Sequence, residues 1–240
     1  MQLALVTMTT PKSGQKKNNQ ERLRQTRALF AYEKSLYDAG ARIIVGIDEV
    51  GRGALAGPVT AAAVVLGADW QLLPGLDDSK RLSPKQRAEL AACLKGETTG
   101  VEAVQGYHVA HVEASFIDEQ GIMPALRLAM TRALEGLVEH TAQLIPDKIL
   151  IDGRPLNLFP HEEAIIKGDS KIACIAAASI LAKVARDELM VQAAELYPEY
   201  DFDSNKGYAS AKHQQVIAKQ GLCPLHRHSF CQNFLQESLF

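Results

Sequence analysis

The alternation of apolar and polar positions along the chain predicts short buried strands interspersed with amphipathic helices. Apolar runs of strand length, bounded by glycine or polar residues, fall at residues 42–48, 58–66, 101–107, 147–152 and 161–167. Helical spacing recurs at residues 21–39, 117–140 and 172–190, and a further helix begins at residue 83. Strands mixed with helices in this way are typical of α/β proteins. We therefore expect an α/β fold in which helices flank one sheet.

Turn residues divide the pattern further. The runs 42–48 and 58–66 are joined by a glycine-rich turn, so we expect an antiparallel pair. Gly121 and Pro124 predict a break near the start of the helix at 117–140. After Tyr197, short helical segments are separated by glycine and proline. We expect a flexible tail at residues 1–20, a main α/β domain at 21–196 and a small helical part at 197–240.

Composition narrows the class of protein. With 240 residues, 47% of them hydrophobic, and a net charge of −2, the chain is globular and its overall charge does not indicate a nucleic-acid binder. Residues 204–236 contain no acidic side chain, which predicts either a basic face for a polyanion or a solvated surface. The four cysteines show no paired framework, and there is no secretory signal and no apolar run of membrane length. We expect a cytoplasmic protein without a membrane partner.

The first strand ends in two adjacent acids, Asp48 and Glu49, followed directly by Gly51, Arg52 and Gly53. Ligands of open α/β sheets bind at the carboxyl ends of strands, and neighbouring carboxylates there favour a divalent cation. The glycines allow close backbone approach, and the arginine suits a phosphate. The alternatives are a solvated loop end or a dinucleotide-binding turn. We set the dinucleotide site aside because a strand, not a helix, follows the glycines.

Two more acids are candidates for the same site. Asp152 ends a second short apolar strand, and if the two strands are parallel neighbours, Asp48 and Asp152 lie together. Ser179, Lys183 and Asp187 recur at helical spacing along one stripe. Asp187 could thus face the strand ends. An ordinary surface ion pair between Lys183 and Asp187 fits the spacing equally well.

Three other segments have possible binding chemistry. The polar loop around Lys80 precedes a helix and could hold a phosphate. Tyr208 lies in a loop among basic residues and could stack on a base or sugar. A further group resembles a zinc site, although its spacing is unusual. Its members are Cys223, His226, His228 and Cys231.

Taken together and in order, several motifs resemble the type 2 ribonucleases H, bacterial ribonuclease HII above all. The resemblance covers residues 22–230, and the matching segments are Gly46–Gly53, Asp78–Lys80, Ile151–Gly153, Lys167–Ser170, Ala176–Asp187, Lys206–Tyr208 and His226–Phe230. His228 departs from the pattern, since the family often has a second arginine there. This departure puts one backbone contact in doubt.

The resemblance implies a ribonuclease H-like mixed sheet and an enzyme that cleaves RNA in RNA/DNA hybrids, including single ribonucleotides embedded in duplex DNA. It implies two Mg²⁺ or Mn²⁺ ions held by Asp48, Glu49, Asp152 and Asp187, with Asp48 bridging them. Cleavage on the 5′ side of the ribonucleotide would leave a 3′-hydroxyl and a 5′-phosphate. The implied substrate-binding residues are Gly51, Arg52 and Gly53, Tyr208, and the phosphate-contact candidates Lys80, Ser170 and Lys183.

Two other function classes stay open at this point. A nucleic-acid binding module with a structural metal would have the acids apart or paired with cations. A DNA nuclease of the same fold would lack the Gly-Arg-Gly turn and the tyrosine that read the 2′-hydroxyl. The final residues, Gln236–Phe240, resemble the short peptides by which bacterial replication proteins dock into the sliding clamp. We expect a monomer.

Overall fold

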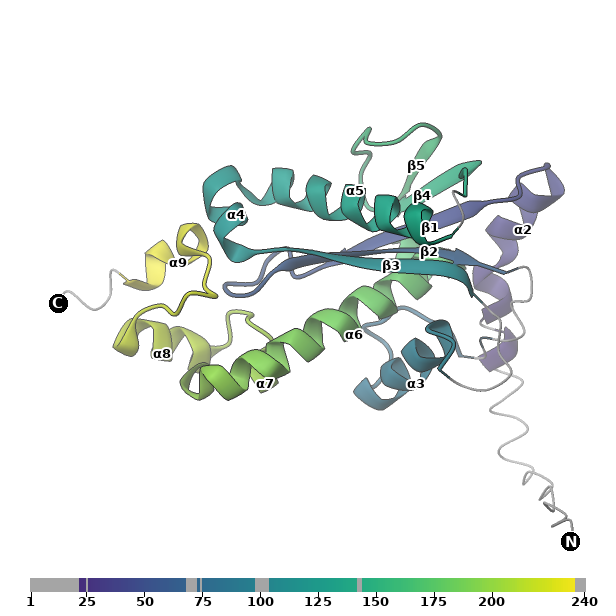
Figure 1. Cartoon of the computed structure of the whole chain (residues 1–240). Helices are drawn as coiled ribbons and strands as arrows, with labels where there is room; N and C mark the ends of the chain where they lie inside the picture. Colours follow the sequence, from purple (N-terminus) through teal and green to yellow (C-terminus); the bar gives the residue numbers. More distant parts are fainter. Residues whose placement is uncertain are drawn as a thin grey trace, which may run out of the picture.

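The computed structural model describes residues 22–24, 26–67, 73, 75–97, 104–141 and 144–235, and a five-stranded mixed sheet forms its centre. In the spatial order β3-β2-β1-β4-β5, the strands are β3 (Val104–Val112), β2 (Val59–Leu66), β1 (Ile44–Val50), β4 (Lys148–Asp152) and β5 (Glu162–Ile165) (Figure 1). β1 pairs antiparallel with β2 and parallel with β4, and β5 runs parallel to β4. The predicted α/β fold with a mixed sheet is confirmed.

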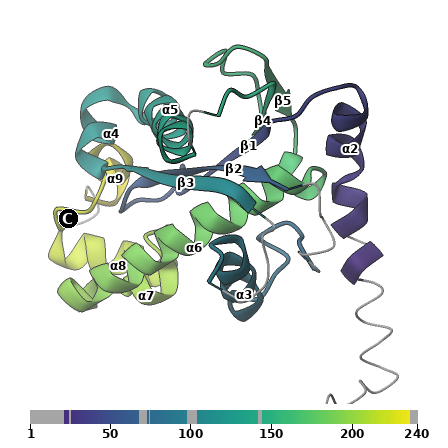
Figure 2. The same ribbon diagram turned by 45° about the vertical axis from the view of Figure 1, so that its right-hand side comes forward.

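Helices cover both faces of this sheet. α5 (Ile122–His140) lies on one face, and α6 (Ala173–Leu196) lies on the other with α3 (Pro84–Leu94) beside it (Figures 1 and 2). Side chains alternate along β2, so Ala63 packs toward α5 while Ala62 packs toward α6. Every residue of β2 is buried, which explains why its sequence is a continuous apolar run. No helix in the described ranges combines the length and the apolar character that crossing a membrane requires.

Several boundaries differ from the sequence-based expectation. β3 continues to Val112, five residues past its predicted end, while residues 101–103 of the predicted strand lie outside the described residues. The break predicted near the start of the helix at 117–140 is confirmed: it separates α4 (Ala114–Gln120) from α5, and the two helices meet at Gly121 with a φ of 88°. Only glycine adopts this conformation without strain, so Gly121 ends one helix and starts the next. α6 begins near the expected residue and continues to Leu196.

The contact between β1 and α6 depends on a glycine. A Cβ atom at Gly46 would lie 2.3 Å from the backbone carbonyl carbon of Cys174, near the start of α6. The buried carboxylate of Glu33 fixes the same end of α6, because the backbone N–H of Cys174 donates to its Oε1 at 2.7 Å. The strand and the helix therefore approach more closely than any side chain larger than hydrogen allows.

We expect Gly46→Ala to destabilise the protein by about 3 kcal/mol, because the clash is with backbone atoms that cannot rotate away. For a chain of this size, that lowers the melting temperature by about 6–12 °C in thermal unfolding. Gly53→Ala is the matched control, because nothing lies within 4 Å of the added Cβ. An unchanged melting temperature for Gly46→Ala would contradict the close packing of β1 on α6.

Residues 197–235 form short helices at one end of the sheet, beyond the turn between β1 and β2 (Figure 1). After a 3-10 turn (Pro198–Tyr200), they are α7 (Phe202–Asn205), α8 (Ala211–Gln220) and α9 (His228–Leu235). Their apolar side chains share a cluster with Leu55 and Ala56 of the β1–β2 turn and with Met190 of α6. The carboxylate of Asp118 in α4 accepts hydrogen bonds from the backbone N–H groups of His228 and Ser229, which fixes the start of α9.

Candidate active site

Asp48 places a carboxylate inside the protein near the end of β1. The residue is 4% exposed, and the strand alternation that directs Ile44 toward α6 directs Asp48 there as well. Its Oδ1 accepts a hydrogen bond from the backbone N–H of Glu49 at 2.7 Å, and it is also hydrogen-bonded to the hydroxyl of Ser179 in α6. Ser179 is linked in turn to Ser79, with 2.9 Å between the two hydroxyl oxygens. The loop before α3 and the helix α6 thus both support Asp48.

Two carboxylates from other segments meet Asp48. Asp152 ends β4, the parallel neighbour of β1, and Asp169 lies in the 3-10 turn Gly168–Ser170 that follows β5. One oxygen from each of the three side chains lies within 4.8 Å of the other two. The backbone N–H of Gly168 donates to Oδ1 of Asp152 at 2.6 Å and joins the two strand ends. The structure brings Asp48 and Asp152 together, as the strand pattern predicts, and adds Asp169.

The electrostatics of these acids favour a bound cation. Burial raises the pKa of Asp48 well above its ordinary range, and the charges of Glu49 and Asp152 raise it further. Burial also raises the pKa of Glu49 and of Asp152, with the neighbouring acids adding to the effect. The charge of Arg52 lowers the pKa of Glu49 and so opposes this effect. Glu49, Arg52 and Asp152 together line an open cleft of about 530 Å³. A divalent cation would relieve this repulsion.

The side chain of Lys80 shows that the cluster of Asp48, Asp152 and Asp169 accommodates a positive charge. Its ammonium nitrogen lies 2.9 Å from Oδ2 of Asp169, which is almost fully buried, while the lysine side chain itself is 78% exposed. Carboxylate oxygens are also the hard ligands that Mg²⁺ and Mn²⁺ prefer. The residues present therefore fit divalent cations.

The fourth predicted acid, Asp187, lies elsewhere. Its Oδ1 accepts a hydrogen bond from the ammonium of Lys183 at 2.8 Å, one turn earlier on α6. Ser179, which contacts Asp48, precedes Asp187 by eight residues, or about two helical turns, and so lies roughly 12 Å away along the helix axis. In the described residues, the carboxylates at metal-binding separation are Asp48, Asp152 and Asp169. Asp169 thus lies beside Asp48 and Asp152, and Asp187 forms the ion pair that helical spacing also allowed.

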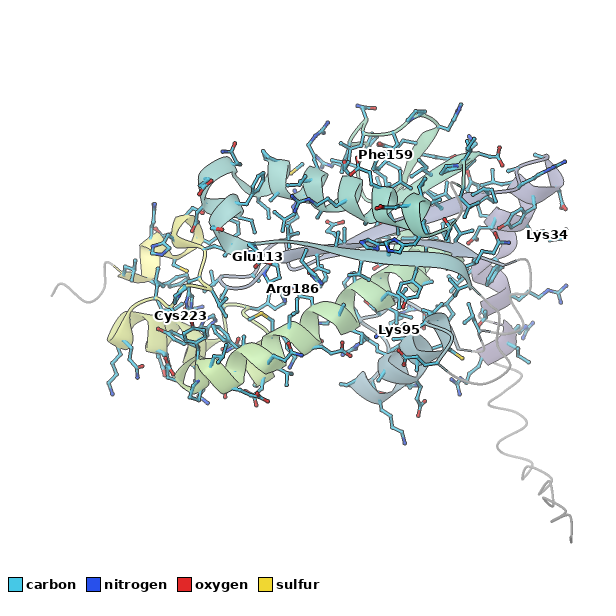
Figure 3. All side chains as sticks on the ribbon, in the orientation of Figure 1. Lys34, Lys95, Glu113, Phe159, Arg186 and Cys223 are labelled. Atoms are coloured by element: carbon cyan, nitrogen blue, oxygen red, sulfur yellow. The ribbon has the colours of Figure 1, made fainter. Side chains whose placement is uncertain are left out.

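The turn of Gly51, Arg52 and Gly53 is held from behind by two arginines with no solvent exposure, Arg186 and Arg227. Figure 3 shows Arg186 between α6 and the sheet. The recorded hydrogen bonds of both guanidinium groups go to backbone carbonyls, and their acceptors are Arg52, Ala56, Gly57, Pro58 and Lys206.

The two arginines fix the turn and create a positive electrostatic potential around it. Burial lowers the pKa of Arg227 to about 10, so the guanidinium is still charged at neutral pH. Gly51 has a φ of 86°, and a Cβ there would lie 2.2 Å from Nε of Arg186. The basic residues of 204–236 are therefore not all on one solvated face, because Arg227 is buried against this turn. The positive charges of Arg186 and Arg227 therefore act across the Gly51–Gly53 turn on a ligand bound at its other side.

Tyr208 sits against the same turn. The carbonyl of Gly207 accepts hydrogen bonds from the backbone N–H groups of Leu55 at 2.8 Å and Ala56 at 3.2 Å. The tyrosine is 36% exposed, and the guanidinium carbon of Arg186 lies 5.3 Å from its ring centroid. Tyr208 is thus partly exposed to a ligand while its loop is fixed to the glycine-rich turn.

The remaining predicted contacts have protein partners. The Ser170 hydroxyl donates to the carbonyl of Lys167 at 3.0 Å, and Lys183 pairs with Asp187. The zinc alternative is not supported: Cys223 and His226 are hydrogen-bonded to each other, but among the described residues they form no metal-type group with His228 and Cys231.

Known proteins match this chain over most of its length. A family model for ribonuclease HII matches residues 45–233. The ribonuclease HII of Endomicrobium trichonymphae is 44% identical over 204 residues, which cover 84% of this chain and 91% of that protein. The crystal structure of ribonuclease H2 from Pyrococcus horikoshii superposes with a TM-score of 0.66 at 25% identity, covering 82% of this chain and 99% of that chain. A structure of a PCNA and ribonuclease HII complex from Archaeoglobus fulgidus matches with a TM-score of 0.62 at 24% identity, covering 78% of this chain and 94% of that chain.

Proposed function

Because the chain belongs to the ribonuclease HII family, it is a ribonuclease H that cleaves RNA in RNA/DNA hybrids, and we propose that Asp48, Glu49, Asp152 and Asp169 form its active site. The observation that carries the proposal is the convergence of three acids from separate segments within 4.8 Å. Glu49 joins them because it follows Asp48 and lines the same cleft as Asp152. Two Mg²⁺ or Mn²⁺ ions bound there would supply charge neutralisation and an activated water for phosphodiester hydrolysis.

The roles of the side chains follow from their positions. Asp48 is central and buried among these acids, so it would be a ligand of the cations. Gly168 orients Asp152 through its N–H, and Lys80 neutralises Asp169 when no metal is bound. With a cation held by these carboxylates, the ammonium of Lys80 would be available to contact a substrate phosphate. We propose Ser170 and Lys183 as further phosphate contacts.

Selection of RNA requires recognition of the 2′-hydroxyl. We propose that the backbone of Gly51, Arg52 and Gly53 contacts this hydroxyl together with Tyr208, and that cleavage occurs on its 5′ side. The turn and Tyr208 are joined by backbone hydrogen bonds, which supports a shared role. In this scheme residues 21–196 supply the catalytic acids, and 197–240 bind substrate.

A cleavage assay tests the proposal directly. The substrates are a DNA duplex with one ribonucleotide and the same duplex made of DNA alone, each with Mg²⁺, with Mn²⁺ or with EDTA. We expect one cut, 5′ of the ribonucleotide, that requires a divalent cation and leaves a 3′-hydroxyl. Cleavage of the all-DNA duplex would favour a DNA nuclease. Binding without cleavage under every metal condition would favour a binding module.

Tyr208→Ala should reduce kcat/KM on the single-ribonucleotide duplex by about 100-fold, because the loss of a stacked and hydrogen-bonded ring costs about 1–3 kcal/mol. A continuous RNA/DNA hybrid should be affected less, since neighbouring ribonucleotides offer other 2′-hydroxyl contacts. The measurement is the ratio of kcat/KM on the two substrates. Equal losses on both would contradict the reading role of the ring.

We also propose a clamp partner and a cytoplasmic location. Gln236–Phe240, the predicted clamp peptide, lies outside the described residues, and the support is that the ribonuclease HII of Archaeoglobus fulgidus is known in a complex with PCNA. Deleting these five residues should abolish binding to an immobilised bacterial clamp while cleavage of a short duplex is unchanged. Unchanged clamp affinity would refute the proposal. The free thiols of Cys174, Cys223 and Cys231 support a reducing compartment.

A further inference from the structure

A line of buried histidine contacts ends on the loop that carries Tyr208. His213 in α8 is 0% exposed, and its Nδ1 lies 2.9 Å from the carbonyl oxygen of Tyr208. Nε2 of His213 lies 3.0 Å from Nε2 of His226, which is 1% exposed. Nδ1 of His226 lies 3.0 Å from the backbone nitrogen of Cys223. The two rings thus connect Tyr208 to the segment before α9.

The partners determine where the protons are. A carbonyl oxygen only accepts, so Nδ1 of His213 carries a hydrogen and its Nε2 is the acceptor of a neutral ring. Nε2 of His226 must then donate to it. The N–H of Cys223 donates to Nδ1 of His226, which is consequently unprotonated. In this arrangement both imidazoles are neutral. Nδ1 of His226 also has Sγ of Cys223 at 3.2 Å, whose S–H can donate to it, and the Cys223 carbonyl oxygen at 3.3 Å.

The surroundings of the pair favour the neutral state. The ring of Tyr200 packs edge-on against both histidines, and the ring of Phe202 lies 5.4 Å from that of His213, edge-on. Burial, with His213 adding to it, lowers the pKa of His226 to about 4. Figure 3 places the labelled Cys223 among these packed side chains of the C-terminal helices. The pair is therefore a fixed hydrogen-bonded unit rather than a solvated one.

The pair also reaches the other half of the substrate-binding region. The backbone of His226 forms an isolated antiparallel bridge with Ala56, which follows the Gly51–Gly53 turn. The N–H of Arg227 donates to the carbonyl of Leu55 at 2.8 Å. One ring therefore belongs to a segment bound to the glycine-rich turn, and the other ring holds the carbonyl of Tyr208.

We propose that His213 and His226 are positioning residues, a neutral hydrogen-bonded pair that sets Tyr208 in register with the Gly51–Gly53 turn. Neither ring touches substrate. Their effect is on discrimination, because a Tyr208 ring shifted from the turn no longer meets the 2′-hydroxyl that the turn binds. This inference rests on the proposed reading role of Tyr208.

Two variants at position 213 separate the effect of the hydrogen bond to the Tyr208 carbonyl from the effect of losing the imidazole ring. In His213→Asn, the amide nitrogen takes the place of Nδ1 and still donates to the Tyr208 carbonyl. In His213→Gln, the amide reaches the place of Nε2 and the contact with Tyr208 is lost. We expect His213→Gln to lower the ratio of kcat/KM on the single-ribonucleotide duplex to that on the continuous hybrid by about tenfold. His213→Asn should keep the ratio within about threefold.

A double-mutant cycle shows whether the effect passes through the tyrosine. In a Tyr208→Ala background, His213→Gln should change the ratio by less than about twofold. An equally large effect in that background, or equal losses on both substrates, would overturn the inference while leaving the role of Tyr208 intact. If Tyr208→Ala alone leaves the ratio unchanged, the reading role fails, and the inference fails with it.

Imidazole ¹⁵N spectra of the full chain at neutral pH give an independent test that does not depend on His213→Gln. We expect two neutral rings, one protonated at Nδ1 and the other at Nε2. His213→Asn and His226→Asn assign the two signals. A charged ring, or two rings with the same tautomer, would overturn the proposed proton arrangement even if the His213→Gln variant does not fold.

Discussion

Replacing Asp169 by asparagine should reduce cleavage of a single-ribonucleotide duplex by at least about 10³-fold, because a lost metal ligand removes several kcal/mol of charge stabilisation. Asp169 lies within 4.8 Å of Asp48 and Asp152, and burial leaves its carboxylate few other partners than Lys80. The measurement is single-turnover cleavage at saturating Mg²⁺. Binding of duplex should change little, since the variant keeps its shape.

Asp187→Asn is the matched control, with the same chemical change on the acid predicted from the sequence. Its carboxylate pairs with Lys183 on a partly exposed helix face, where such pairs contribute about 0–1 kcal/mol. We expect cleavage within about fivefold of the unaltered protein. If Asp187→Asn abolishes cleavage and Asp169→Asn does not, the group around Asp48 is not the metal site.

The contrast between these two acids shows what the sequence could and could not predict. Asp48 and Asp152 end apolar strands, and period-2 alternation alone places them on one face of the sheet. Asp169 has a similar sequence pattern, since it also lies just after a predicted strand, in the turn that follows it. Its contribution depends on β5 being the parallel neighbour of β4, and strand order is a property of the tertiary fold. A search for acids after every predicted strand would have included it.

Asp187 enters the predicted set only through the family resemblance, because helical spacing gives the stripe of a helix but not the turn that faces the site. α6 has 24 residues and so extends roughly 36 Å. The seven residues of β1 span only about 23 Å, so part of α6 must extend past the strand ends. Ser179 meets Asp48, and the turns after it extend into the C-terminal part.

The C-terminal part shows a different limit of sequence-based prediction. Its absence of acids indicated a basic face for a polyanion, yet Arg227, His213 and His226 are buried. Buried arginine and histidine are uncommon, so composition alone favours a solvated surface. These residues satisfy backbone carbonyls of the β1–β2 turn and of the Tyr208 loop, and such partners are not visible in a residue pattern.

Asp48→Asn should abolish cleavage, with a loss of at least about 10⁴-fold, and at the same time stabilise the metal-free protein. The carboxylate is buried beside two other acids, and its pKa is raised well above the ordinary value. At pH 7 the charged form therefore weakens the fold, and a neutral amide of the same shape removes that cost. We expect the free energy of unfolding in EDTA to rise by about 1–3 kcal/mol, measured by urea denaturation.

The pH dependence of this difference tests its electrostatic origin. An acid whose folded-state pKa is raised destabilises the protein increasingly as the pH rises from its ordinary pKa to the raised one, so the gain from asparagine should disappear as the pH falls toward 4, near the ordinary carboxyl pKa of 3.8. Adding Mg²⁺ at pH 7 should reverse the order, because the metal raises the melting temperature of the unaltered protein and not that of the variant. A variant that is less stable than the unaltered protein in EDTA at pH 7 would show that Asp48 is a structural acid rather than one held for cation binding.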